Sequence, residues 1–175
     1  MKPIIYLRAL MPEDAAIACH WRNNPKIWAY TKRTVDHMVT KEMEREWIVK
    51  VNAVTQDKRF AICLQESQQY IGNIQLVGIK NREAHFHIFI GEECCWGKGI
   101  AQQATTLLLD YAFTELEMKT ILLDVHQDNH AGMAIYQKTG FKIIGQKGLF
   151  VNMILTKGQY YKAKSRSSEK QESIR

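Results

Sequence analysis

The most constraining feature of the chain is a change of hydrophobic period on either side of residues 91–99. Residues 83–90 alternate between two faces, which is typical of a strand in a half-buried sheet. One face carries Ala84, Phe86, Ile88 and Ile90, and the other carries Glu83, His85, His87 and Phe89. After Gly97-Lys98-Gly99, apolar residues recur at helical spacing, at Ile100, Ala104, Leu107, Leu108, Tyr111 and Ala112. The fold must therefore hold a glycine turn between a strand and the start of a long helix.

The remaining patterns predict one α/β (α+β) domain. In order they indicate a strand at 4–7, helices at 12–22 and 40–52, strands at 60–64, 70–79 and 83–90, the helix from residue 100, a strand at 121–125, a helix at 129–139 and a strand from 141 to 145. The three consecutive strands with short links favour an antiparallel meander. We expect a single domain over residues 1–160 and a basic tail over 161–175.

Charge and composition restrict the partners. The formal net charge is +6, and six basic against two acidic residues between 157 and 175 supply most of it. A basic terminus is usually a solvated tail, so we expect no nucleic-acid partner. No apolar run approaches the roughly 18 residues of a membrane span, so no membrane association is expected. The start lacks a signal peptide and the four cysteines form no disulfide framework, which predicts a cytoplasmic protein.

The turn at residues 97–99 suits a pyrophosphate. Glycines let backbone N–H groups converge, and a helix N-terminus adds partial positive charge. Two other phosphate motifs fail here. The Walker loop fails because Lys98 is followed by Gly99 and has no glycine at the required spacing before it, and the dinucleotide fingerprint fails because its last glycine position is Gln102.

The segment Trp96-Gly97-Lys98-Gly99-Ile100-Ala101 resembles the acyl-CoA pyrophosphate loop of the GNAT N-acetyltransferases, written [QR]-x-x-G-x-[GA]. Gly99 and Ala101 match its small positions, whereas Trp96 replaces Gln or Arg, as in the ribosomal-protein, spermidine and amino-sugar branches. A second segment, Asn129-x-x-Ala-x-x-x-Tyr136-x-x-x-Gly140-Phe141, is similar to the family's second signature. The resemblance covers most of the chain.

The resemblance implies the GNAT fold, with a mixed, mostly antiparallel sheet of about six or seven strands and helices on both faces. It also implies acetyl-CoA as co-substrate and transfer of its acetyl group to a primary amine within a ternary complex. The pantetheine arm would pair with the strand near Phe89, Ile90 and Gly91, beside the loop residues Trp96 to Ala101. Asn129 would contact the CoA arm, and Tyr136 would protonate the departing thiolate.

The general base is left open among Glu83, His85 and His87, which share one strand face. His85 falls where several family members place a catalytic Glu, and a histidine titrates in the range suited to accepting a proton. His126, at the end of the next strand, is a further candidate. The His85-x-His87 pair lacks a third ligand at convincing spacing, so no metal is expected.

The acceptor is expected at the helix-loop-helix segment 19–47. Stacking and hydrogen-bonding groups there, together with His126, form the predicted acceptor site: Trp21, Arg22, Asn23, Trp28 and Tyr30. They suit a small-molecule amine such as an amino sugar slightly better than a protein N-terminus or a polyamine. A non-catalytic acyl-CoA-binding module and a scaffold for a basic-tail interaction protein are the remaining hypotheses, and a homodimer is left open.

Overall fold

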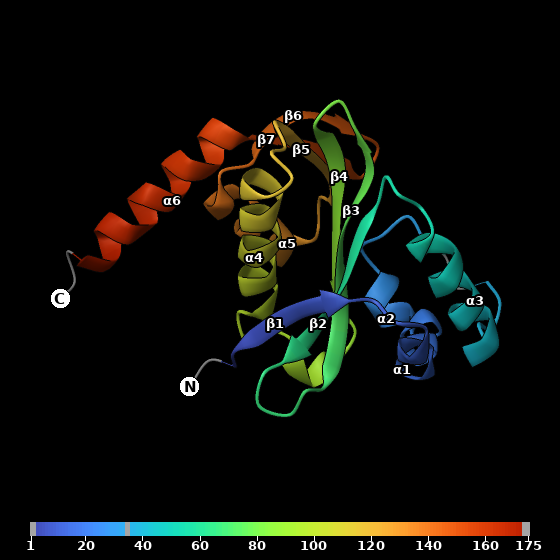
Figure 1. Ribbon diagram of the computed structural model, residues 1–175. Coiled ribbons are helices and arrows are strands. Elements are labelled where there is room, and N and C mark those ends of the chain that lie inside the picture. Colours follow the sequence, from blue (N-terminus) through green and yellow to red (C-terminus); the bar gives the residue numbers. More distant parts are fainter. Residues whose placement is uncertain (1–2, 34–35, 173–175) are drawn as a thin grey trace.

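The antiparallel meander lies at the centre of a seven-stranded sheet in the computed structural model of the chain (Figure 1). The structure describes residues 3–33 and 36–172. The strands are β1 (Ile5–Ala9), β2 (Lys58–Leu64), β3 (Tyr70–Lys80), β4 (Glu83–Ile90), β5 (Thr120–His126), β6 (Lys142–Lys147) and β7 (Phe150–Thr156). Their order is β1-β2-β3-β4-β5-β7-β6, and β4 with β5 is the parallel pair. The predicted mixed, mostly antiparallel sheet is confirmed.

Helices cover both faces of this sheet, as predicted. Figure 1 shows α4 (Ile100–Thr114) and α5 (His130–Thr139) on one face. The other face carries α1 (Ala15–Arg22), α2 (Pro25–Trp28) and α3 (Lys41–Asn52). The short 3-10 turns are η1 (Pro12–Asp14) and η2 (Glu93–Cys95), and α6 (Lys157–Glu172) extends away from the body.

Each face of the sheet has its own core. Phe86, Leu108 and Ile121 belong to the cluster beneath α4, whereas Trp21 and Ile48 belong to the cluster beneath α1 and α3. One detail of the predicted helix face of α4 is wrong. Leu107 is 43% exposed, because its position lies at the margin of the apolar stripe.

The C-terminal region holds two elements that the sequence reading missed. Strand β7 pairs with β5 over its whole length, from Thr120↔Thr156 to His126↔Phe150. Its buried residues Val151, Met153 and Leu155 alternate, so a period-two signal was present. Helix α6 runs through the predicted boundary between residues 160 and 161, and its Tyr160 is buried with its hydroxyl donating to Asp110 at 2.8 Å.

Strands β4 and β5 pair only briefly. Their parallel register covers Glu83–His85 against Thr120–Leu122, and the strands separate beyond it. On its other edge β4 stays paired with β3 as far as Gly91, whose N–H donates to the Ile71 carbonyl at 2.8 Å. Because strand residues alternate, the N–H groups of Ile88 and Ile90 lie on the open edge.

Trp21 fixes the end of β4. Its buried indole packs on Tyr70 and Phe89, and its N–H donates to Glu92 at 3.1 Å. A Cβ added to Gly91 would lie 2.1 Å from the nearest indole atom. Glycine is therefore required at the point where the chain leaves the sheet for the turn.

Substituting Gly91→Ala should lower the free energy of unfolding by about 1–3 kcal/mol, because the rigid indole has to move. Urea denaturation measures the change. Gly158→Ala is the matched control, since a Cβ at that helical position meets no atom within 4 Å and should keep stability or raise it by up to about 1 kcal/mol. Equal stability of the two variants would contradict the role given to Trp21.

Candidate active site

The glycine turn presents a row of unused donors. Gly97 and Gly99 adopt φ values of +72° and +77°, which favour glycine, and Gly99 is the N-cap of α4. Within the described part of the chain, none of the backbone N–H groups of residues 97–102 donates a hydrogen bond. An uncapped helix N-terminus with converging amides suits an anionic group such as a diphosphate.

The other residues of the predicted loop hold this turn in place. Ile100 is buried and anchors the first turn of α4, while Ala101 is half-buried beside it. The Trp96 indole N–H donates to the Ile90 carbonyl at 2.9 Å, which closes the turn against β4. Lys98 is exposed. The contacts of these residues with acetyl-CoA remain predictions. The backbone N–H groups of residues 97–102, which donate no hydrogen bond within the described residues, are compatible with such contacts.

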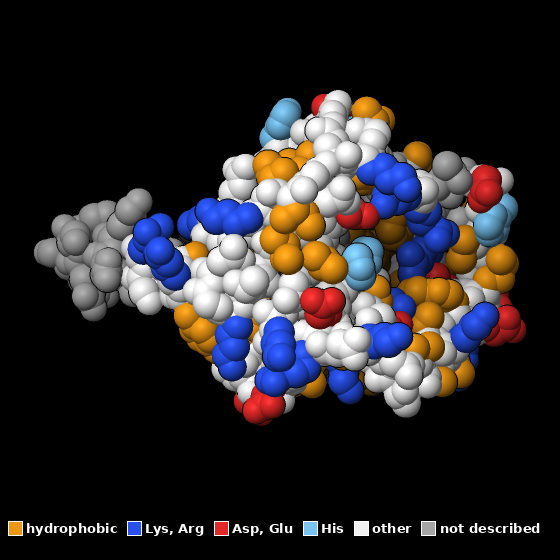
Figure 2. Space-filling view, turned by 90° about the horizontal axis from the view of Figure 1, so that it is seen from above, with side chains coloured by type: hydrophobic (Ala, Val, Ile, Leu, Met, Phe, Trp, Pro, Cys, Tyr) orange, Lys and Arg blue, Asp and Glu red, His pale blue; other side chains and the backbone are white. Residues whose placement is uncertain are grey.

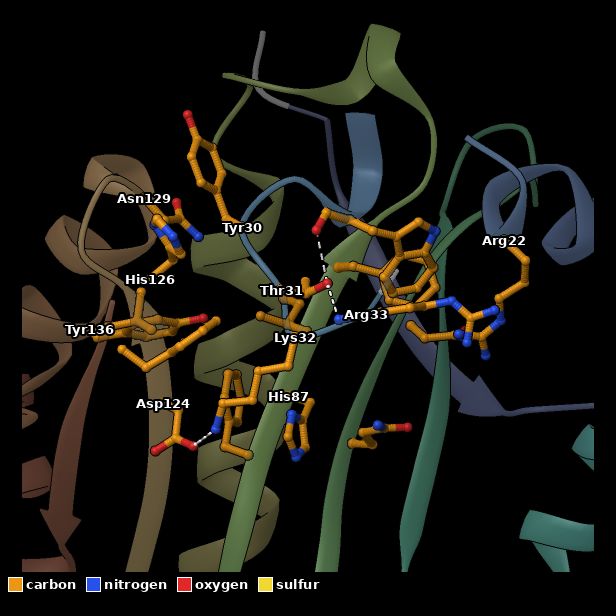
Figure 3. A pocket seen from close by; sticks show the side chains of 18 of the residues that line it. Arg22, Tyr30, Thr31, Lys32, Arg33, His87, Asp124, His126, Asn129 and Tyr136 are labelled. Atoms are coloured by element: carbon orange, nitrogen blue, oxygen red, sulfur yellow. Dashed lines mark hydrogen bonds and ion pairs between the residues drawn. The ribbon is translucent and has the colours of Figure 1, made fainter. Parts of the chain in front are cut away.

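A pocket of about 330 Å³ opens where β4 and β5 part. Figure 2 shows the hollow on this face with basic side chains around it, and Figure 3 shows its lining from close by. Strands, the segment after α2, and α5 all contribute. The residues that line it are Arg22, Trp28, Tyr30, Thr31, Lys32, Arg33, Trp47, Asn73, Gln75, Phe86, His87, Ile88, Phe89, Asp124, Val125, His126, Asn129, Tyr136 and Phe150.

Eight residues predicted for the site line this one pocket, and they come from five elements and the loops between them: Arg22, Trp28, Tyr30, His87, Phe89, His126, Asn129 and Tyr136. Trp21 and Asn23 lie outside its lining and have structural contacts instead. The Asn23 amide donates to the Cys19 and Val39 carbonyls, both at 2.8 Å, and so holds the chain after α2. Glu83 and His85 lie nearer the paired end of β4 and β5 and do not line the pocket.

Tyr136 reaches the pocket from α5, whose N-terminus is capped by Asn129 through a 2.9 Å bond from Gly132 N–H. The ring is buried edge-to-face against Phe86 and Phe141, with centroids 5.9 and 5.7 Å away. No hydrogen bond within the described residues uses its hydroxyl, which is accessible in the pocket. Burial raises the pKa of Tyr136, so the phenol is protonated at neutral pH.

His87 is the histidine of β4 that faces the pocket. Displacement of bulk water by the pocket walls, and then repulsion from His85, lower the pKa of His87 below its usual value. The imidazole is therefore neutral at neutral pH and can accept a proton. His126, on β5, packs against the rings of Tyr30 and Phe150 at centroid distances of 5.6 and 5.3 Å, and its Nδ1 accepts the Asp128 N–H.

Arg22 forms the inner wall of the pocket and is held rigidly. Its Nε donates to both oxygens of Glu44 at 3.0 Å, and the two side chains are 10% and 3% exposed. The guanidinium also lies over Trp47 at 4.4 Å and Trp28 at 5.1 Å. Periodicity gave no sign that Glu44 would be buried, since a charged helix residue is usually solvated.

Several lining residues were not predicted. Asp124 accepts from Lys32 Nζ at 2.6 Å and from Asn152 Nδ2 at 2.5 Å, and both bonds lower the pKa of its carboxyl. Arg33 lies over Trp28 at 5.2 Å, where burial and then repulsion from Arg22 lower its pKa. An acidic residue within the apolar run 121–125 was the available signal for Asp124, but the pairing with Lys32 joins segments 92 residues apart.

Within residues 3–33 and 36–172, no group of three or more His, Cys, Asp or Glu residues is arranged to hold a metal ion. No helix in the same ranges has the length and apolar character needed to cross a membrane.

The chain belongs to the GNAT acetyltransferase family, whose domain model matches residues 5–142. Among curated relatives, it is 27% identical over 158 residues to an uncharacterised N-acetyltransferase, p20, of Bacillus licheniformis, covering 87% of this chain and 85% of the relative. It is 26% identical over 156 residues to the spermidine N(1)-acetyltransferase of Escherichia coli K12, covering 87% and 74%.

A solved structure has a similar fold. The spermidine N-acetyltransferase of Vibrio cholerae, in complex with CoA and spermine, superposes with a TM-score of 0.80 at 25% identity, covering 90% of this chain and 98% of that one. The protein is thus an acyl-CoA-dependent N-acetyltransferase with acetyl-CoA as its co-substrate.

Proposed function

We propose that the pocket between β4 and β5 receives a small molecule with one primary amine, such as an amino sugar, and that this amine is acetylated. The observation that carries the proposal is the convergence of His87 and Tyr136 on this pocket at the open edge of β4. A neutral base and a protonated phenol beside one cavity are the two groups that amine acetylation requires.

The residues would act in sequence. The amides of residues 97–102 hold the diphosphate of acetyl-CoA, and the open edge at Ile88 and Ile90 aligns the thioester and stabilises the developing oxyanion. The acceptor ammonium first loses one proton to solvent, and His87 takes a second proton as the neutral nitrogen attacks the carbonyl carbon. The C–N bond forms, the C–S bond breaks, and Tyr136 gives its proton to the thiolate. Because burial raises the pKa of Tyr136, this last transfer relies on close positioning.

The charge of the pocket favours a monoamine. Of the lining residues, all within the described ranges, Asp124 is the one carboxylate, whereas Arg22, Lys32 and Arg33 are cationic. A polyamine brings several ammonium groups and would meet these cations. A sugar ring brings one amine together with hydroxyl groups, and its apolar face can pack on Trp28 and Tyr30.

A polyamine is the second candidate, and a specific observation favours it. The relatives include spermidine acetyltransferases, from Escherichia coli at 26% identity and from Vibrio cholerae at 25% identity. We place it second because the cationic lining of this pocket opposes a multiply charged acceptor.

A panel of amines with acetyl-CoA and detection of the released thiol tests the acceptor class. Nucleotide-linked and free amino sugars should give the highest kcat/KM, above spermidine and peptides with free N-termini. Spermidine as the best acceptor would overturn the monoamine proposal in favour of the second candidate. Binding of CoA without turnover of any amine would support an acyl-CoA-binding module instead.

Substituting Tyr136→Phe should lower kcat by about tenfold or more, because the thiolate loses its proton donor. The Kd for CoA, measured by calorimetry, should stay within about twofold, since the ring remains packed between Phe86 and Phe141. Tyr111→Phe on α4 is the matched control. Tyr111 lies outside the pocket, so this variant should keep the wild-type kcat. An unchanged kcat in Tyr136→Phe would remove the role of the phenol.

The His87→Ala variant should lose about a hundredfold in kcat/KM at neutral pH. Only the neutral imidazole accepts a proton, and desolvation lowers the pKa of His87, so the part of the activity that depends on His87 should be lost only below about pH 6.5. The ratio of wild-type to variant kcat/KM cancels the ionisation of the amine and should decrease through that range. The His85→Ala variant should retain this ionisation in its pH profile. Loss of the ionisation in His85→Ala, and not in His87→Ala, would assign the general base to His85.

We also propose that the protein is located in the cytoplasm. All four cysteines are free thiols, and three of them are buried. Free thiols are typical of a reducing compartment.

A further inference from the structure

We propose that Asp124 and Phe150 form a subsite for the primary ammonium group of the acceptor, and that the side chain of Lys32 occupies this subsite until the acceptor displaces it. The inference rests on the proposed function, because it names the charged group that the acceptor presents. It assigns Asp124 to recognition and Lys32 to competition with the substrate.

The contacts of Lys32 are those that a bound amine would make. Its ammonium lies 2.6 Å from Asp124 Oδ2 and 4.9 Å from the centre of the Phe150 ring. A carboxylate combined with an aromatic face is a general arrangement for binding ammonium groups. The chain thus carries a lysine amine, on a four-carbon stem, inside the pocket assigned to an amine acceptor (Figure 3).

The carboxylate is held ready independently of Lys32. Asp124 pairs with Asn152 across β5 and β7, and the Asn152 amide donates to the other carboxylate oxygen, Oδ1. The neighbours Leu123 and Val125 are buried in the core, so the alternation of β5 directs Asp124 to the opposite face. This orientation leaves Oδ2 available for an ammonium donor.

The position of Lys32 allows displacement. It follows α2 in an irregular segment, and its side chain is 64% exposed, whereas that of Asp124 is 31% exposed. Exposed ion pairs are weak, so an incoming amine with better contacts can replace Lys32 at small cost. Arg22 and Arg33 stay in the pocket after the exchange, which restricts the subsite to one cationic group.

Binding of n-butylammonium chloride, the free analogue of the lysine side chain, tests the subsite without acetyl-CoA. NMR titration of backbone amides in β5 and β7 gives the Kd, with sodium chloride added to constant ionic strength because salt screens exposed charges. The Lys32→Met variant should bind about two- to fivefold more tightly than the wild type, since the internal competitor is weak. Asp124→Asn should bind about tenfold more weakly or show no saturation.

Lys164→Met is the matched control, because Lys164 pairs with Asp110 at 2.5 Å far from the pocket. It should keep the wild-type Kd. Equal or weaker binding by Lys32→Met, or wild-type binding by Asp124→Asn, would overturn the subsite. Lys32→Met remains decisive if Asp124→Asn fails to fold. If n-butylammonium follows the expected pattern while no amine is acetylated, the subsite stands and the proposed acceptor chemistry fails.

Discussion

The parting of β4 from β5 beyond His85 is the constraint on which the site depends. Backbone groups inside a sheet need partners, and an unpaired buried amide costs free energy comparable to a lost hydrogen bond. The open edge of β4 therefore has to face solvent or a bound molecule. The sheet tolerates the gap because β3 holds β4 on one side and β7 holds β5 along its whole length on the other.

This gap also joins the two faces of the sheet. A continuous sheet would separate His87, on the face of α1 and α2, from Tyr136, which belongs to the core beneath α4. Where the strands part, both side chains line one cavity, together with Phe86 of the core. A proton acceptor and a proton donor can thus stand on opposite sides of a reacting carbonyl, which a single face could not provide.

Apart from the short helix α2, which falls in a predicted loop, the order of the main helices and strands as far as residue 145 could be predicted because each has a strong local signal. The alternation of 83–90 and the glycine turn at 97–99 are examples. Tyr136 and Asn129 were instead assigned through the resemblance to the GNAT family. The ion pairs that the residues of the pocket form could not be predicted. Contacts such as Arg22 with Glu44 and Lys32 with Asp124 join distant segments, and no periodicity records them. The alternation of Val151, Met153 and Leu155 was readable and was missed.

The two substrates depend on different parts of the chain. The turn at residues 97–102 offers backbone amides, which remain when a side chain changes, so Trp96 can stand where the family pattern [QR]-x-x-G-x-[GA] has Gln or Arg. The acceptor instead contacts side chains. Loss of one buried or charged side chain alters the preference for one acceptor over another by a large factor. Membership of the family therefore carries the use of acetyl-CoA with it, whereas the acceptor has to be argued from Asp124 and the cations of this pocket.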